Sequence, residues 1–159
     1  MKAGLRGGPL FSSVKDVEGV TSMPGSSSGA AHAHRRETPK TILVADDNPA
    51  IRKALCETFE IEGNYDLCAE AVNGAEAITL AKQWRPDLII LDLSMPEMTG
   101  YDAALEIKRI LPGTPIILLT LYADTVREQL MGVNSPIDLI VSKSDLANIL
   151  KHVRSLIPV

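Results

Sequence analysis

The segment DLIILDLSMPEMTG, residues 87–100, carries the strongest indication of the fold. It begins with an apolar run from Leu88 to Leu91, which ends at the carboxylate Asp92 and a loop that contains Pro96. An apolar run without alternation is typical of a strand that is buried on both faces of a parallel sheet. A strand that simply ended in solvent would also explain one aspartate, so the meaning of Asp92 depends on the residues at the other strand ends.

Short apolar runs and helical patterns alternate on both sides of this segment, from Lys40 to the end of the chain. The helical patterns place apolar residues three and four positions apart, as on the buried side of an amphipathic helix. The apolar side of the second helix is predicted to include Ala77, Leu80, Ala81 and Trp84. The predicted strands cover residues 41–46, 65–71, 87–91, 115–120 and 137–141, and the predicted helices lie within residues 48–63, 73–84, 101–111, 123–132 and 145–157.

This alternation predicts an α/β fold with one parallel sheet. Each crossover helix must pack back on the sheet in the right-handed sense, so helices cover both faces. We therefore expect a flavodoxin-like, doubly wound, five-stranded parallel sheet of order 2-1-3-4-5 with five helices. In such a sheet the site lies beyond the carboxyl ends of the strands, at the switch point between the first and third strands.

The composition limits the class of protein. A chain of 159 residues with a net charge of −4 and a pI of about 5.4 suits one acidic domain and favours neither nucleic acid nor an anionic membrane as partner. Cys56 and Cys68 have no metal-binding spacing, which favours reduced thiols in the core. No apolar stretch approaches the roughly 20 residues of a membrane span, and we expect a cytoplasmic protein.

Residues 1–39 are rich in glycine and serine and show no apolar periodicity. Such a segment cannot bury enough apolar surface to offset the entropy of ordering it. We predict a disordered N-terminal tail at 1–39 and one domain at 40–159. His32 and His34 in the tail are interpreted as inert, because an isolated His-x-His pair in a polar tail is a weak metal signal.

Polar side chains follow four of the five predicted strands: Asp46 and Asp47, Asp92, Thr120 and Lys143. Each has an ordinary explanation when it is taken singly, such as a helix cap or a surface lysine. Three carboxylates at one sheet edge would, however, repel one another and raise one another's pKa unless a cation bound between them. A set of oxygen ligands of this kind suits Mg²⁺.

A carboxylate beside Mg²⁺ can also act as a nucleophile and form an aspartyl phosphate. Catalysis of phosphoryl transfer consists mainly of positioning and charge neutralisation. The Lys143 ammonium and the Thr120 hydroxyl are suited to that task. The set of strand-end residues therefore predicts a phosphoryl acceptor.

The chain resembles the receiver domain of bacterial two-component response regulators. The resemblance rests on ILVADDNP, PDLIILDLSMPEMTG, PIILLT and the lysine of IVSKSD, and it covers roughly residues 40–157. The sequence of residues 73–100 is most similar to that of receivers that usually precede a helix-turn-helix DNA-binding domain. It implies a phosphoprotein of a phosphorelay, and not an enzyme.

The resemblance also implies roles for individual residues. Asp92, with its carboxylate exposed, would accept a phosphoryl group from a sensor histidine kinase or a histidine phosphotransfer protein. Asp47, Asp92 and the main-chain carbonyl of Ser94 would bind Mg²⁺, with Asp46 acting through water. Thr120 and Lys143 would contact the phosphoryl group. Phosphorylation would then change a surface formed by the fourth helix, the fifth strand and the fifth helix, which binds a protein partner or a second copy of the chain.

Three positions depart from the pattern of the family. Ile140 stands where the family usually has an aromatic switch residue, and Tyr122 is an alternative candidate for that role. Leu121 follows Thr120 where a small residue is commoner, so we expect slower attack on the phosphoryl group by water or a bulky donor. Ser144 follows Lys143 where proline is usual.

Few residues follow Lys143, so we expect a stand-alone receiver without an output domain and without direct nucleic acid binding. An alternative is a degenerate receiver that acts as a constitutive protein-interaction module. A second alternative is a phosphatase or phosphotransferase of the haloacid dehalogenase type. That chemistry requires an acid two residues after the nucleophile, where this chain has Ser94. A flavodoxin proper would need a phosphate-binding loop where this chain has Asp46 and Asp47.

Overall fold

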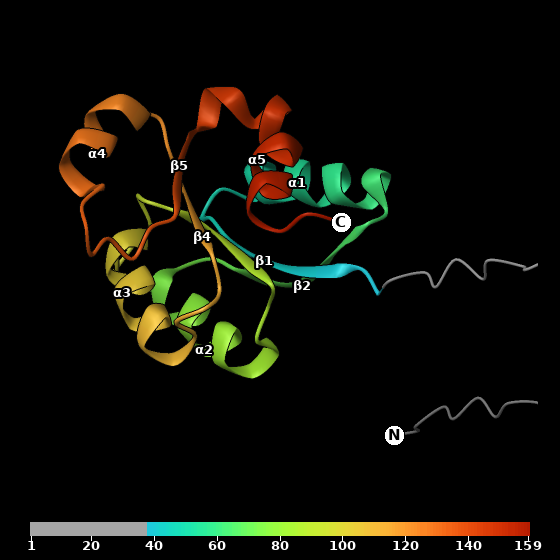
Figure 1. The fold of residues 1–159 in the computed structure, drawn as a ribbon, viewed down its shortest axis with the longest axis horizontal. Helices are drawn as coiled ribbons and strands as arrows, with labels where there is room; N and C mark the ends of the chain where they lie inside the picture. The colour runs from blue at the N-terminus through green and yellow to red at the C-terminus, as the bar shows by residue number, and fades with distance from the viewer. Residues whose placement is uncertain (1–37) are drawn as a thin grey trace, which may run out of the picture. The chain divides into compact units, whose positions relative to one another are not determined.

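The computed structural model describes residues 38–159 (Figure 1). The predicted tail, with His32 and His34, therefore lies outside the described residues except for positions 38 and 39. The elements, in chain order, are β1 (Lys40–Ala45), α1 (Pro49–Glu62), β2 (Tyr65–Ala71), α2 (Gly74–Trp84), β3 (Leu88–Asp92), α3 (Gly100–Ile110), β4 (Ile116–Thr120), α4 (Ala123–Leu130), β5 (Leu139–Ser142), the 3₁₀ helix η1 (Lys143–Asn148) and α5 (Ile149–Leu156).

The five strands form one parallel sheet in the order β2-β1-β3-β4-β5, which confirms the predicted topology. β1 lies beside β3, with Ala45 opposite Leu91, and β3 lies beside β4, with Asp92 opposite Leu119. The strand order reverses at β1, since β2 lies on one side of it and β3 on the other. The carboxyl ends of β1 and β3 therefore form the switch point where ligands bind in such sheets.

Helices cover both faces of the sheet, and each layer has its own core. Figure 1 shows α1 and α5 on one side of the strands and α2 and α3 on the other, with α4 beside β5. β3 supplies buried residues to both cores, as expected for a strand covered on both faces. The helical residues of the first core are Leu55, Phe59, Ile149 and Val153, and those of the second include Ala77, Ala81, Ala103, Ala104, Ile107 and Val126.

Side-chain caps fix the starts of the helices next to the switch point. Asn48 accepts a hydrogen bond from the N–H of Ala50 at the start of α1, and Thr99 accepts one from the N–H of Asp102 at the start of α3. Such caps satisfy main-chain donors that have no partner inside the helix. Gly63 ends α1 with a left-handed φ of 72°, a conformation that costs glycine little.

The prediction that Trp84 lies on the buried side of α2 is wrong, because 52% of its surface is exposed. Ala77 and Ala81 are fully buried. Trp84 is the last residue of α2, and the chain leaves the helix at Arg85 with a left-handed φ of 46°. The indole therefore lies beyond the part of the helix that packs on the sheet.

The helix predicted at 145–157 begins as a separate 3₁₀ helix. Asp145 has a non-helical backbone, with φ −108° and ψ 19°. Its carboxylate accepts a hydrogen bond of 2.7 Å from Asn148 Nδ2 and lies 3.1 Å from His152 Nε2. Local bonds of an aspartate to nearby groups compete with regular helix, so the α-helix starts only at Ile149.

The structure bears on two predictions made from the composition, the reduced cysteines and the lack of a membrane span. Cys56 and Cys68 are free thiols and partly buried, and Cys68 packs against the core beneath α2 and α3. Within residues 38–159, none of the helices combines the length and the apolar character needed to cross a membrane.

Candidate functional site

Three carboxylates meet at the switch point, and we call Asp46, Asp47 and Asp92 the acidic pocket. Each contributes one oxygen, and these oxygens lie within 4.8 Å of one another. Asp46 and Asp92 are buried, whereas Asp47 is exposed. β1 and β3 are neighbours in the sheet, so residues that follow β1 necessarily approach the end of β3.

Lys143 connects two of these carboxylates. Its Nζ lies 2.8 Å from Oδ2 of Asp46 and 3.1 Å from Oδ1 of Asp92. The lysine side chain is only 15% exposed. It reaches the acidic pocket from the first residue of η1, directly after β5. The structure therefore brings Lys143 to Asp46 and Asp92 as predicted, although β5 is adjacent to neither β1 nor β3 in the sheet.

Asp46 is held through its main chain and one side-chain oxygen. Its N–H donates to the carbonyl of Ala71, and its carbonyl accepts a 2.7 Å hydrogen bond from Nη1 of Arg52. Its Oδ1 accepts from the N–H of Asn48 at 2.8 Å. Oδ2 is buried, and its partner is the ammonium of Lys143.

Asp92 is enclosed by the loop that follows it. Its Oδ1 accepts a 3.2 Å hydrogen bond from the N–H of Ser94. Gly100, at the start of α3, lies so close that an added Cβ would be 2.1 Å from the main-chain oxygen of Asp92. The expectation that the Asp92 carboxylate is exposed is wrong: the residue is 2% exposed, because Lys143 and this loop cover it.

The buried charges shift each other's ionisation. Burial raises the pKa of Asp92, the Lys143 hydrogen bond lowers it and the charge of Asp46 raises it, so that the pKa lies above its usual value. Burial alone would lower the pKa of Lys143, but its hydrogen bonds to Asp46 and Asp92 raise the pKa overall. The pocket therefore contains more negative charge than one lysine balances.

These features fit a divalent cation. The donor set consists of carboxylate oxygens, the ligands that Mg²⁺ prefers. The buried carboxylates of Asp46 and Asp92 share the single ammonium of Lys143, and after burial the charge of Asp46 is a further cause that raises the pKa of Asp92. Asp47 gives the group an exposed side, through which an ion with bound water could enter.

Thr120 ends β4 beside the pocket and is 3% exposed. Its hydroxyl accepts a 3.2 Å hydrogen bond from the N–H of Tyr122, the residue before α4. The Tyr122 side chain is 72% exposed, and Leu121 between them is 67% exposed. The hydroxyl of Thr120 is thus linked to the backbone that starts α4.

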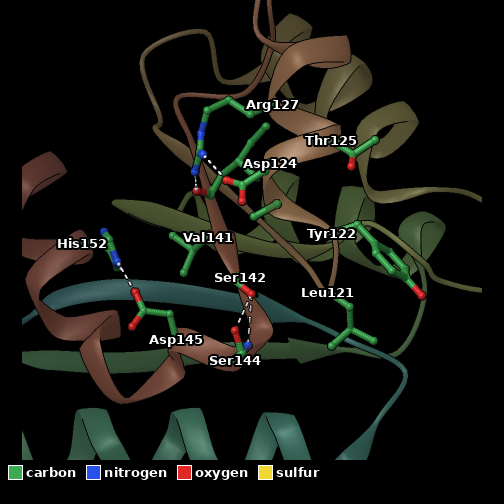
Figure 2. A pocket seen from close by; sticks show the side chains of 12 residues that line it. Leu121, Tyr122, Asp124, Thr125, Arg127, Val141, Ser142, Ser144, Asp145 and His152 are labelled. Carbon is green, nitrogen blue, oxygen red and sulfur yellow. Dashed lines mark hydrogen bonds and ion pairs between the residues drawn. The ribbon is translucent and has the colours of Figure 1, made fainter.

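A hollow of about 540 Å³ lies between the start of α4, β5 and η1 (Figure 2). Arg127 reaches from α4 toward β5, where its Nη2 donates to the carbonyl of Ile140 at 3.2 Å and its Nη1 pairs with Asp124 at 3.0 Å. Ile140 itself is 2% exposed and belongs to the core beneath α4. On the side of the hollow away from α4, Asp145 lies 3.1 Å from His152 Nε2.

Sequence patterns predict correctly which strand ends carry the acids and the lysine, but they do not predict the contact of Arg52 with the main chain of Asp46. Arg52 has no distinct signal in the sequence, although its guanidinium binds the carbonyl that joins Asp46 to Asp47. The available signal is an arginine on the first turns of the helix that follows two aspartates. A basic residue there has many ordinary explanations, so the signal is weak.

Comparison with known proteins identifies the family. The sequence profile of the response regulator receiver domain matches residues 42–154, and the chain belongs to this family. Receiver domains are phosphorylation-dependent signalling domains of two-component systems, and most of them are not enzymes.

Individual relatives agree with this assignment. The chain is 44% identical over 87 residues to the transcriptional regulatory protein PdtaR of Mycobacterium tuberculosis, a match that covers 54% of this chain and 40% of that protein. It is 40% identical over 83 residues to YhcZ, an uncharacterized transcriptional regulatory protein of Bacillus subtilis, with 52% and 39% covered. The matches thus span less than half the length of these relatives.

A solved structure resembles this chain over nearly its own full length. The response regulator TrrA of Thermotoga maritima, in complex with Mg(2+)-BeF, is 39% identical with a TM-score of 0.65, and the match covers 74% of this chain and 99% of TrrA.

Proposed function

We propose that Asp92 accepts a phosphoryl group from a phosphohistidine and thereby switches a partner-binding surface. The observation that carries this proposal is the acidic pocket with Lys143 bound between Asp46 and Asp92. The donor is a sensor histidine kinase or a histidine phosphotransfer protein. We place the reaction in the cytoplasm.

In the proposed reaction, a carboxylate oxygen of Asp92 forms a bond to phosphorus while the bond from phosphorus to the donor imidazole nitrogen breaks. The electron pair stays on the imidazole. Lys143, already 3.1 Å from Asp92, neutralises charge on the transferring group, and Thr120 donates its hydroxyl hydrogen to a phosphoryl oxygen.

The cation in this proposal is Mg²⁺. Asp47, Asp92 and the main-chain carbonyl of Ser94 would hold it, and Asp46 would act through water. The ion would supply positive charge for the phosphoryl oxygens. The grouping of three carboxylates around one lysine and the exposed position of Asp47 support this assignment.

The output surface that we propose is the side of the molecule formed by α4, β5 and η1, continuing into α5. When the Thr120 hydroxyl turns to the phosphoryl group, the N–H of Tyr122 loses its acceptor. The start of α4 then shifts, and Tyr122 moves with it. Ile140 acts as a buried support under α4 and not as a side chain that swings out. The partner is a downstream protein or a second copy of the chain, with no direct contact to nucleic acid.

The test is incubation with acetyl phosphate and Mg²⁺, followed by intact mass. We expect the wild-type chain to gain one phosphoryl group and Asp92→Asn to gain none. The matched control is Asp66→Asn, which changes an exposed aspartate on β2. This variant should be phosphorylated like the wild type. Leu121→Ala should lose the group faster, because a smaller side chain opens the approach to water.

A second candidate is a degenerate receiver that binds its partner constitutively. The buried, aliphatic Ile140 favours it, because it lacks the size and the polar tip of the aromatic switch residue that the family usually has at this position. The same experiment separates the two candidates: a chain that gains no mass from any phosphodonor, yet binds its partner, would support the degenerate receiver.

A further inference from the structure

Arg52 lies on α1 beside the acidic pocket. Its side chain is 17% exposed, and its Nη1 donates to the main-chain carbonyl of Asp46 at 2.7 Å. Its Nε lies 3.4 Å from Oε1 of Glu70 near the end of β2. The guanidinium therefore joins three elements, namely the loop after β1, α1 and β2.

The main chain of Asp46 is held on both sides of its Cα, through the peptide before the residue and the peptide after it. The N–H of Asp46 donates to Ala71, and the carbonyl of Asp46 accepts from Arg52. This carbonyl belongs to the peptide that links Asp46 to Asp47. Asp47 is exposed, and within residues 38–159 its side chain makes no hydrogen bond or ion pair, so the main chain next to it is what places its Cβ relative to the other two acids.

We propose that Arg52 is a positioning residue for the cation site. By holding the carbonyl of Asp46, it sets the direction in which the Asp47 carboxylate points toward the other two acids. This inference rests on the proposed function, since it concerns the same cation. Glu70 assists by pairing with the guanidinium and so limiting its rotation.

The proposal makes a prediction that is opposite in sign to a simple charge effect. Arg52 is a positive charge near a cation site, so its loss should strengthen cation binding if only Coulomb repulsion mattered. Its loss should weaken cation binding if the hydrogen bond to Asp46 aligns the ligands. Outer contacts that orient ligands typically change metal affinity about 10–100-fold.

The experiment is calorimetric titration of the purified chain with Mg²⁺, without a phosphodonor. We expect Arg52→Met, which keeps the apolar stem and removes the donors, to bind Mg²⁺ about tenfold more weakly. Arg52→Lys keeps a donor and should stay within about threefold of the wild type. Lys53→Met is the matched control, because Lys53 is 77% exposed on the same helix and, within residues 38–159, forms an ion pair only with Glu57, at 3.7 Å. It should bind as the wild type does, or slightly more tightly.

The outcomes separate this inference from the proposed function. If the wild type binds Mg²⁺ and Arg52→Met binds it equally or more tightly, the positioning role is overturned and the phosphorylation proposal stands. A wild-type chain that binds no Mg²⁺ overturns both. If Arg52→Met does not fold, NMR of the Arg52 side chain in the wild type decides: slowed rotation of the guanidinium supports the bound geometry, and free rotation rejects it.

Discussion

Helices α3 and α4 flank β4 in the chain, yet they are attached to the sheet very differently. α3 has 11 residues, a side-chain cap at Thr99 and four buried residues, whereas α4 has 8 residues, no side-chain cap and one buried residue, Val126. α3 starts against the backbone of Asp92, while α4 starts shortly after the buried hydroxyl of Thr120.

This difference separates the part of the domain that must stay fixed from the part that can move. The residues around Asp92 are aligned by close backbone packing, which a transfer reaction needs. α4 has little buried apolar surface, so its displacement costs little. The proposed switch therefore acts on the helix that the fold holds least firmly.

Gly100→Ala should have the largest effect, because it pushes α3 away from Asp92. The added Cβ would lie 2.1 Å from the main-chain oxygen of Asp92 and 2.9 Å from its carbonyl carbon. We expect a loss of about 3 kcal/mol or more in the free energy of unfolding, measured by urea denaturation. Gly113→Ala is the control, since a Cβ added to Gly113 would extend into open space with no packing neighbour within 4 Å. A similar loss there would contradict the steric explanation.

A matched pair of truncations compares the cores of the two helices directly. Ile107 on α3 is fully buried, and Val126 on α4 is 8% exposed. Ile107→Ala should lower the free energy of unfolding by about 3 kcal/mol and Val126→Ala by about 1 kcal/mol. Equal losses would show that α4 is anchored as firmly as α3.

The acidic pocket should destabilise the cation-free protein at neutral pH. The pKa of Asp92 is raised in the folded state, so its contribution to stability is greatest below the unfolded pKa and is lost as pH rises through the folded pKa. In EDTA, Asp92→Asn should therefore be more stable than the wild type at pH 7, and this advantage should shrink at pH 4. Urea denaturation at both pH values tests the sign.

Addition of Mg²⁺ should reverse this order at pH 7. A hundredfold excess over the dissociation constant stabilises a one-site protein by about 2.7 kcal/mol. We expect a gain of this order for the wild type and a smaller one for Asp92→Asn. An equal gain for both proteins would mean that Asp92 takes no part in binding the ion.

Arg127→Met should have the smallest effect, confined to α4. It removes the hydrogen bond to the carbonyl of Ile140, worth about 1 kcal/mol, so amides of α4 should exchange with solvent about fivefold faster. Amides of α3 should not change. Arg109→Met is the control, because Arg109 is an exposed arginine of α3 that, in the described part of the chain, pairs only with Glu106. Faster exchange in both helices would indicate a global loss of stability.

The sheet could be predicted because its signals are local and agree with one another. Uninterrupted apolar strands, amphipathic helices and short connections leave one topology, and that topology brings Asp46, Asp92, Thr120 and Lys143 to one edge. The convergence of these residues therefore followed from strand order alone, without any knowledge of side-chain contacts.

The remaining features depend on contacts that no local pattern contains. The burial of Asp92 arises from Lys143, which lies far along the chain and reaches over it. The 3₁₀ start before α5 arises from hydrogen bonds of Asp145 that compete with the helix. Arg52 has the periodicity of an ordinary helical residue, and only the position of the Asp46 carbonyl gives it a distinct role.

The hydrogen bond from Arg127 to Ile140 also bears on how the domain avoids aggregation. β5 is an edge strand, and the main-chain groups of an edge can pair with a strand from another molecule. α4 lies beside this strand, and Arg127 ties the two together through the carbonyl of Ile140. A movement of α4 that withdrew Arg127 would uncover part of β5, so the same displacement that exposes a signalling surface would also expose a strand to unwanted pairing.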